Sequence, residues 1–135
     1  MIGIDTNVLV RYFAQDDPRQ SAMAVRLIER SLSPQAPGHV SLVALAELAW
    51  VLRTRFDAAK DTVIDIVTHL LADERFAVQS QHAVWAALDA YRHAAVDFAD
   101  ALIAALDRAQ GCTHTVTFDR RAARIEGMTL LDSTH

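Results

Sequence analysis

The sequence predicts an α/β protein in which helices cover both faces of a mostly parallel sheet of four to five strands. Two observations support this class. Short apolar or β-branched segments alternate along the chain with longer segments that have the hydrophobic periodicity of helices. The chain has 135 residues, 52% of them hydrophobic, and contains no repeat or linker-like stretch. We therefore expect one domain over residues 1–135 with a single substantial core.

The N-terminal segment predicts a strand followed at once by a helix. Residues 2–4 are apolar and predict a short strand. Three good helix-capping residues, Asp5, Thr6 and Asn7, come next. Residues 8–13 are apolar enough to form a short buried helix. This order places Asp5 at the junction between the strand and the helix.

The later elements follow from similar signals. Asp17 is a capping acid and Pro18 occupies a first helical position, so a helix is expected from there to about residue 32. Residues 33–38 contain two prolines and a glycine and predict a loop. Further strands are expected over residues 39–41, 76–79, 113–117 and 128–131, and further helices over residues 42–53, 58–72, 81–93, 97–110 and 119–125.

The composition excludes several classes of protein. The formal charge of −4 argues against a polybasic nucleic-acid binder, although 12 of the 13 basic residues are arginine, which suits phosphate contacts. The single cysteine, Cys112, excludes an internal disulfide and a zinc site built mainly from thiolates. We find no secretory signal and no apolar stretch long enough to span a bilayer, and we expect a cytoplasmic protein.

Two aspartates follow predicted strands. Asp5 comes just after the first strand and Asp119 just after the strand over residues 113–117. In open parallel sheets, functional sites lie beyond the carboxyl ends of the strands, so these two carboxylates are expected to converge. The alternative is that each only caps the helix that follows it.

Glu47 lies in a segment that is otherwise almost entirely apolar. Between residues 40 and 52 the only other polar side chain is that of Ser41. A helix that is apolar on all sides is expected to be buried, and a lone buried carboxylate is costly unless it is paired or bound to a metal. We favour a functional role, with a buried ion pair to an arginine as the alternative.

Asp97 and Asp100 are three residues apart and share a helix face. Asp97 is expected to cap the helix, and Asp100 lies before an apolar run. Acids in a first turn also interact favourably with the helix dipole, which is the simpler explanation. We favour Asp100 as a metal ligand and Asp97 as a cap or outer-shell acid.

Several carboxylates in one pocket would repel one another, and a divalent cation relieves that repulsion. Magnesium and manganese prefer oxygen ligands, and such a site activates water for attack on a phosphodiester. Other chemistries fit worse, because the four glycines form no phosphate-binding loop and the six histidines include no close pair of metal-ligand spacing.

The aromatic side chains of Trp50, Trp85, Phe98 and Phe118 are expected in the core. Arg120, Arg121 and Arg124 form a small basic cluster beside Asp119.

The acidic segments resemble those of PIN-domain proteins. Residues 1–9 resemble the start of that family, and residues 97–105 are similar to its third acidic motif. Residues 117–120 look like its last motif, and Glu47 falls where its helical glutamate is expected. The resemblance covers residues 1 to about 131, and the four pieces occur in the family's order.

The resemblance implies a three-layer α/β/α sandwich and a magnesium- or manganese-dependent endoribonuclease that hydrolyses RNA with a metal-activated water. The acids carried over as catalytic and metal-binding are Asp5, Glu47, Asp100 and Asp119. Outer-shell positions are assigned to Asp97, Asn7 and Thr117. Candidate residues at the RNA-binding rim are Arg11, Arg53, Arg120 and Arg121.

The compact length and the acidic–proline segment at residues 16–18 look most like the VapC toxins of type II toxin–antitoxin pairs. This likeness implies a homodimer and a cognate antitoxin whose tail blocks the acids. Two alternatives remain within the family: an RNA-processing nuclease without an antitoxin, and a catalytically silent module that binds RNA or protein. A haloacid-dehalogenase-like phosphatase fits worse, because Asn7 stands where its second aspartate is needed and Lys60 is the only lysine.

Overall fold

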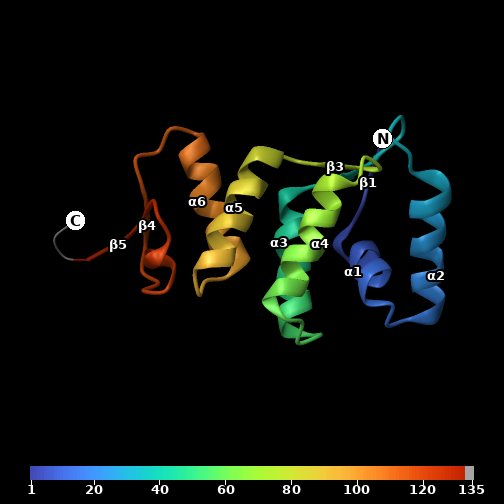
Figure 1. Cartoon of the computed structure of the whole chain (residues 1–135), viewed down its shortest axis with the longest axis horizontal. Coiled ribbons are helices and arrows are strands. Elements are labelled where there is room, and N and C mark those ends of the chain that lie inside the picture. The colour runs from blue at the N-terminus through green and yellow to red at the C-terminus, as the bar shows by residue number, and fades with distance from the viewer. Residues whose placement is uncertain (133–135) are drawn as a thin grey trace. The chain divides into compact units, whose positions relative to one another are not determined.

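The computed structural model describes residues 1–132, which contain six α-helices and five short strands (Figure 1). The α/β class is confirmed, and every pair of adjacent strands is parallel. The chain forms two compact units, one over Met1–Gln79 and a second from Ser80 onward. The five strands are hydrogen-bonded as a group of three in the first unit and a group of two in the second.

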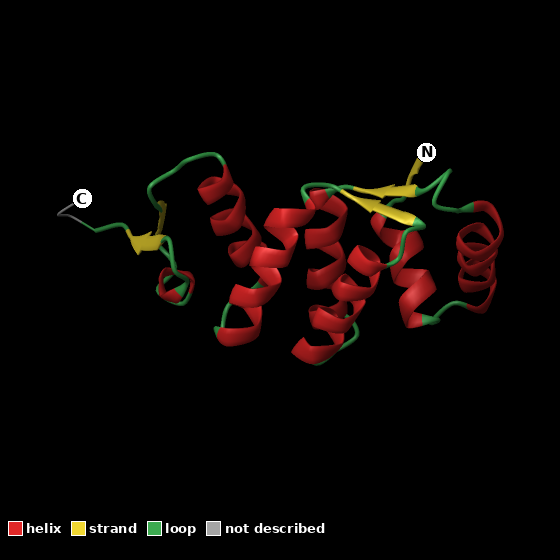
Figure 2. Cartoon of the chain, turned by 45° about the horizontal axis from the view of Figure 1, so that its top comes forward, coloured by secondary structure: helices red, strands yellow, loops and turns green. Residues whose placement is uncertain are grey.

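The first unit alternates strands with helices. Its elements, in chain order, are β1 (Ile2–Gly3), α1 (Thr6–Ala14), α2 (Pro18–Arg26), a π-helical turn (Leu27–Ser31), β2 (Gly38–Val40), α3 (Leu42–Thr54), α4 (Lys60–Ala72) and β3 (Phe76–Val78). The strand order is β1–β2–β3, with Ile2 opposite Gly38 and Gly38 opposite Phe76. Figure 2 shows these strands gathered near the N-terminus of the chain. Because the strands are parallel, α1 and α3 both begin at the carboxyl edge of this sheet.

The core of the first unit lies between its sheet and its helices. Leu45 and Leu48 of α3 and Val63, Val67 and Leu70 of α4 are fully buried. Their spacing of three or four residues places them on one face of each helix, as the sequence periodicity predicts. Burial of these side chains from water is the main source of stability for this unit.

The second unit contains a helix pair and a two-stranded sheet. Its elements are α5 (Gln81–His93), α6 (Phe98–Ala109), β4 (Thr115–Thr117), a single 3₁₀ turn (Ala122–Arg124) and β5 (Met128–Leu130). The rings of Tyr91 and Phe98 meet edge to face with centroids 5.6 Å apart where α5 and α6 join. Both rings are buried, so they fix the helix pair.

The predicted elements agree with the observed ones to within a few residues, with two differences. The helix expected to reach residue 32 ends as α2 at Arg26 and continues as one π-helical turn. The helix expected over residues 119–125 is a 3₁₀ turn of three residues. The side chain of Asp119 accepts hydrogen bonds from the backbone N–H groups of Arg121 and Ala122, which tightens this turn. Within residues 1–132, no helix is long and apolar enough to cross a membrane.

Gly38 provides a test of the packing at the centre of the three-stranded sheet. A Cβ atom there would lie 2.7 Å from Cγ1 of Ile4 and 2.9 Å from Cδ1 of Leu32, and both neighbours are buried. We expect Gly38→Ala to lower the free energy of unfolding by about 1–3 kcal/mol, because the added methyl group overpacks the core. Gly3→Ala is the matched control, since a Cβ atom at Gly3 meets nothing within 4 Å. Urea denaturation measures both, and equal midpoints for the two variants would contradict this account.

Candidate active site

The predicted acids are divided between the two units. Asp5 and Glu47 belong to the first unit, and Asp97, Asp100 and Asp119 belong to the second. Asp5, Asp97 and Asp100 lie at helix starts, Asp119 lies two residues after β4, and Glu47 lies in the middle of α3. Within residues 1–132, no group of three or more His, Cys, Asp or Glu side chains is arranged to hold one metal ion.

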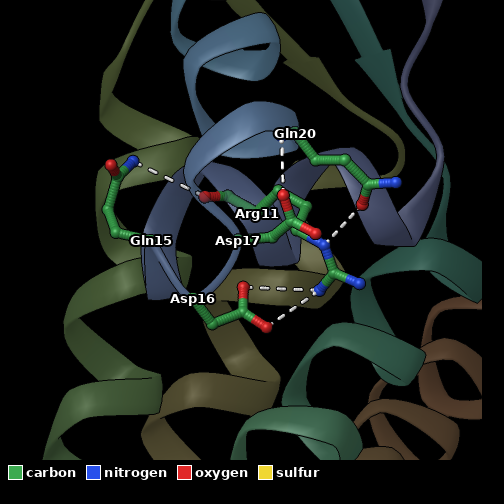
Figure 3. Close-up of polar contacts among 5 residues, drawn as sticks. All are labelled: Arg11, Gln15, Asp16, Asp17 and Gln20. Atoms are coloured by element: carbon green, nitrogen blue, oxygen red, sulfur yellow. Dashed lines mark hydrogen bonds and ion pairs between the residues drawn. The ribbon is translucent and has the colours of Figure 1, made fainter.

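Asp5 occupies the N-cap position of α1, yet its side chain makes no cap hydrogen bond. Asp17 does the opposite at the start of α2, where its Oδ1 accepts a hydrogen bond from the backbone N–H of Gln20 at 2.9 Å (Figure 3). A side-chain cap bond contributes about 1 kcal/mol. Asp5 is exposed and forgoes that contribution, so its carboxylate is available to another ligand.

Arg11 is expected at the RNA-binding rim, but its guanidinium group contacts other side chains of the first unit. Its Nη1 lies 3.2 Å from Oδ2 of Asp16, and its Nε donates to Oε1 of Gln20 at 2.7 Å (Figure 3). These contacts tie α1 to the start of α2. Arg53 is exposed and donates from Nη1 to the carbonyl oxygen of Ala58 at 2.8 Å. Asn7, expected in the outer shell, is exposed in the first turn of α1.

Glu47 lies on an exposed face of α3, so the expectation that it is buried is wrong. Val43 and Trp50, which flank it at helical spacing, are 70% and 60% exposed. The helix is apolar all round, but its buried side is the one that carries Leu45 and Leu48. Periodicity cannot identify the free face of such a helix, which is why the sequence misled here. An exposed Glu47 needs no ion-pair partner, and its oxygens are accessible.

Asp100 is an acid in an electrostatically unfavourable environment. It lies in the first turn of α6 and is half-buried. Burial raises the pKa of its carboxyl, and the negative charges of Asp97 and then Asp119 raise it further. These three carboxylates therefore influence one another within the second unit. Asp97 occupies the N-cap position of α6 without a side-chain cap bond, as Asp5 does for α1.

Asp73 differs from Asp100 because it forms an ion pair with a basic side chain. Its Oδ2 lies 2.6 Å from Nη2 of Arg75, and the hydrogen bonds from that guanidinium hold the pKa of Asp73 below its usual value. No basic side chain forms an ion pair with Asp100 within residues 1–132. A divalent cation would take the place of that missing partner.

Asp119 has the capping role that was considered as an alternative for it. Its Oδ1 accepts from the backbone N–H of Arg121 at 2.8 Å and from that of Ala122 at 3.3 Å. Thr117 supports it, because the Thr117 hydroxyl accepts from the Asp119 backbone N–H at 3.0 Å. Both capping bonds use Oδ1, so Oδ2 can accept a further ligand. Capping and metal binding are thus compatible at this residue.

The aromatic residues expected in the core are only partly there. Phe98 is buried, but Trp50, Trp85 and Phe118 are 60%, 47% and 79% exposed. For these three the expectation is wrong, because an aromatic residue packs inside only where a second element covers it. Phe118 stands out among them, since it directly precedes Asp119. The sequence feature that could have identified Phe118 as a functional residue is its position directly before an acid and two arginines.

The family comparison covers nearly the whole chain. A family model described as PIN domain matches residues 2–128, a span that includes parts of both units. No curated protein matches the chain significantly. The matched span contains all five of the predicted acids.

We expect Asp100→Asn to stabilise the protein in EDTA at pH 7, with an unfolding midpoint higher by roughly 1–3 °C. The raised pKa of Asp100 means that the ionised carboxylate is disfavoured in the folded state, and asparagine removes that charge. The difference should vanish as the pH falls below the folded-state pKa, because the carboxyl is then neutral as well. Thermal unfolding followed by circular dichroism measures this effect. Asp65→Asn, at an exposed position on α4, is the control, and an unchanged midpoint for Asp100→Asn at pH 7 would refute the repulsion.

Proposed function

We propose, from the premise that the chain belongs to the PIN-domain family, that it is a metal-dependent endoribonuclease. PIN domains are generally nucleases, and those nucleases generally depend on divalent metals. The observation that carries the proposal is the state of Asp100, which is half-buried beside two other carboxylates without a basic partner in the described chain. Such a carboxylate gains most from a bound cation.

The acids fit magnesium or manganese by their donor chemistry. Asp5 and Asp97 cap helices without using their carboxylates, and Glu47 is accessible. We assign Asp5, Glu47, Asp100 and Asp119 as the metal-binding and catalytic set. When bound, the metal activates water and neutralises charge on the phosphodiester. Asp97 is an outer-shell acid that acts on Asp100, and Thr117 orients Asp119 through its backbone hydrogen bond.

We propose that residues 1–135 form one PIN domain. The family match supports this proposal, because the matched span, residues 2–128, contains all four assigned acids. We also propose that the protein is the toxin of a VapBC-type pair, active as a homodimer and inhibited by a cognate antitoxin. The support for this finer proposal is the similarity of residues 1–9 and 16–18 to that group.

The purified protein should cleave RNA in magnesium or manganese and not in EDTA. Asp5→Asn and Asp100→Asn should each lower the cleavage rate by roughly 100-fold or more, because each removes a charged metal ligand. Asp65→Asn should cleave as the wild type does. Gel analysis of cellular RNA with all four proteins measures this. Full metal-dependent cleavage by either site variant would show that the assignment of that residue is wrong.

Induced expression in a bacterial host tests the toxin proposal. Growth should stop with the wild type and continue with Asp5→Asn, because arrest requires cleavage of cellular RNA. Co-expression of a small protein encoded next to this gene should restore growth and should co-purify with the chain. Normal growth at high levels of an active wild-type nuclease would favour an RNA-processing enzyme. Metal-independent RNA binding without cleavage would favour a silent binding module.

A further inference from the structure

Phe118 is the most exposed large apolar side chain in the part of the protein that the structure describes, with 79% of its surface accessible. It lies between the end of β4 and Asp119. The backbone around it is hydrogen-bonded on both sides, by the Thr117 hydroxyl to the Asp119 N–H and by the Asp119 carboxylate to the Arg121 N–H. The ring is therefore carried by a turn that these hydrogen bonds restrain.

Three arginines follow the ring closely in the sequence. Arg120, Arg121 and Arg124 follow within six residues, and all three are exposed. None of their guanidinium groups forms an ion pair with an acid of residues 1–132. Unpaired arginines attract phosphate oxygens and contact them through two parallel hydrogen bonds. The turn thus presents an aromatic face and a group of free cations on one short segment.

We propose that Phe118 stacks on an unpaired RNA base and that Arg120 and Arg121 contact the adjoining phosphates, which positions the strand at Asp119. This inference rests on the proposed nuclease function, because it names residues that would bind the RNA substrate of that nuclease. Phe118 is a substrate-binding residue in this scheme. It takes part in no proton transfer and holds no metal.

The chemistry of the turn specifies the class of RNA. Stacking on a side chain requires a base whose face is free, which excludes the interior of a duplex and favours single strands, loops and ends. Every base has such a face, so the contact tolerates sequence changes. The substrate class is therefore unpaired RNA, with sequence preference supplied by other residues.

A protein partner is the competing occupant of this surface. Val116 of β4 is also exposed and lies two residues before Phe118. Two apolar side chains alone would suit a protein surface equally well. The three unpaired arginines favour a polyanion, because a protein partner would need matching acids to balance them.

The test measures binding of a single-stranded RNA oligonucleotide that contains 2-aminopurine, with every protein in an Asp5→Asn background so that the RNA stays intact. We expect Phe118→Leu to weaken binding by about 5- to 30-fold and to remove the change in 2-aminopurine fluorescence. Phe118→Tyr, which keeps a ring, should bind within about twofold of the parent. Trp85→Leu removes an exposed ring elsewhere in the second unit and should have no effect. The unfolding midpoint of Phe118→Leu should equal that of the parent.

Three results would overturn the inference. The first is equal RNA affinity for Phe118→Leu and the parent. The second is a loss of affinity accompanied by a fall in the unfolding midpoint, which would mean that the ring packs against protein. The third is cleavage of RNA by Phe118→Leu, in an otherwise wild-type chain, with unchanged kcat/KM. If the wild type neither binds nor cleaves RNA in manganese, the proposed function itself fails and this inference fails with it.

Discussion

The junction between a short parallel strand and the helix after it is the constraint on which the candidate site depends. The strands have only two or three residues, and the residue that caps the next helix directly follows a strand at Ser41 and lies two residues after a strand at Asp5. Its side chain can either satisfy the helix N-terminus or face a ligand. Because parallel strands end at the same edge of a sheet, this choice is made repeatedly at neighbouring places.

The chain makes this choice in both ways at its helix N-termini, including those of α2 and α6, which follow another helix rather than a strand. Ser41 and Asp17 accept hydrogen bonds from the first turns of their helices and serve stability. Asp5 and Asp97 hold the same backbone position and make no such bond. Forgoing a favourable local interaction is typical of functional positions, where stability is lost for the sake of a ligand. Asp119 lies between these cases, because one carboxylate oxygen caps a turn and the other is available.

Local signals predicted local structure well. The alternation of short apolar and longer periodic segments predicted the α/β class, and the cap at Asp17 followed from Pro18 beside it. Properties that depend on what covers a surface were not predictable. The exposure of Glu47, Trp50 and Phe118 is of this kind, since an apolar helix or an aromatic ring is buried only where another element packs on it. The separation of the strands into groups of three and two likewise depends on pairing partners that no single segment specifies.

The net charge of −4 does not conflict with RNA as a substrate, because the placement of charge matters more than its sum. The acids that set this balance include Asp100, whose pKa is raised by burial and by the negative charges of Asp97 and Asp119. A divalent ion bound at these acids, as the proposed function requires, would convert that local negative charge into an attraction for phosphate. The arginines after β4 are unpaired in the described chain and add to the same attraction. A chain that is acidic overall can therefore still present local positive charge to RNA at the turn after β4, and a metal bound at the acids would add to that attraction.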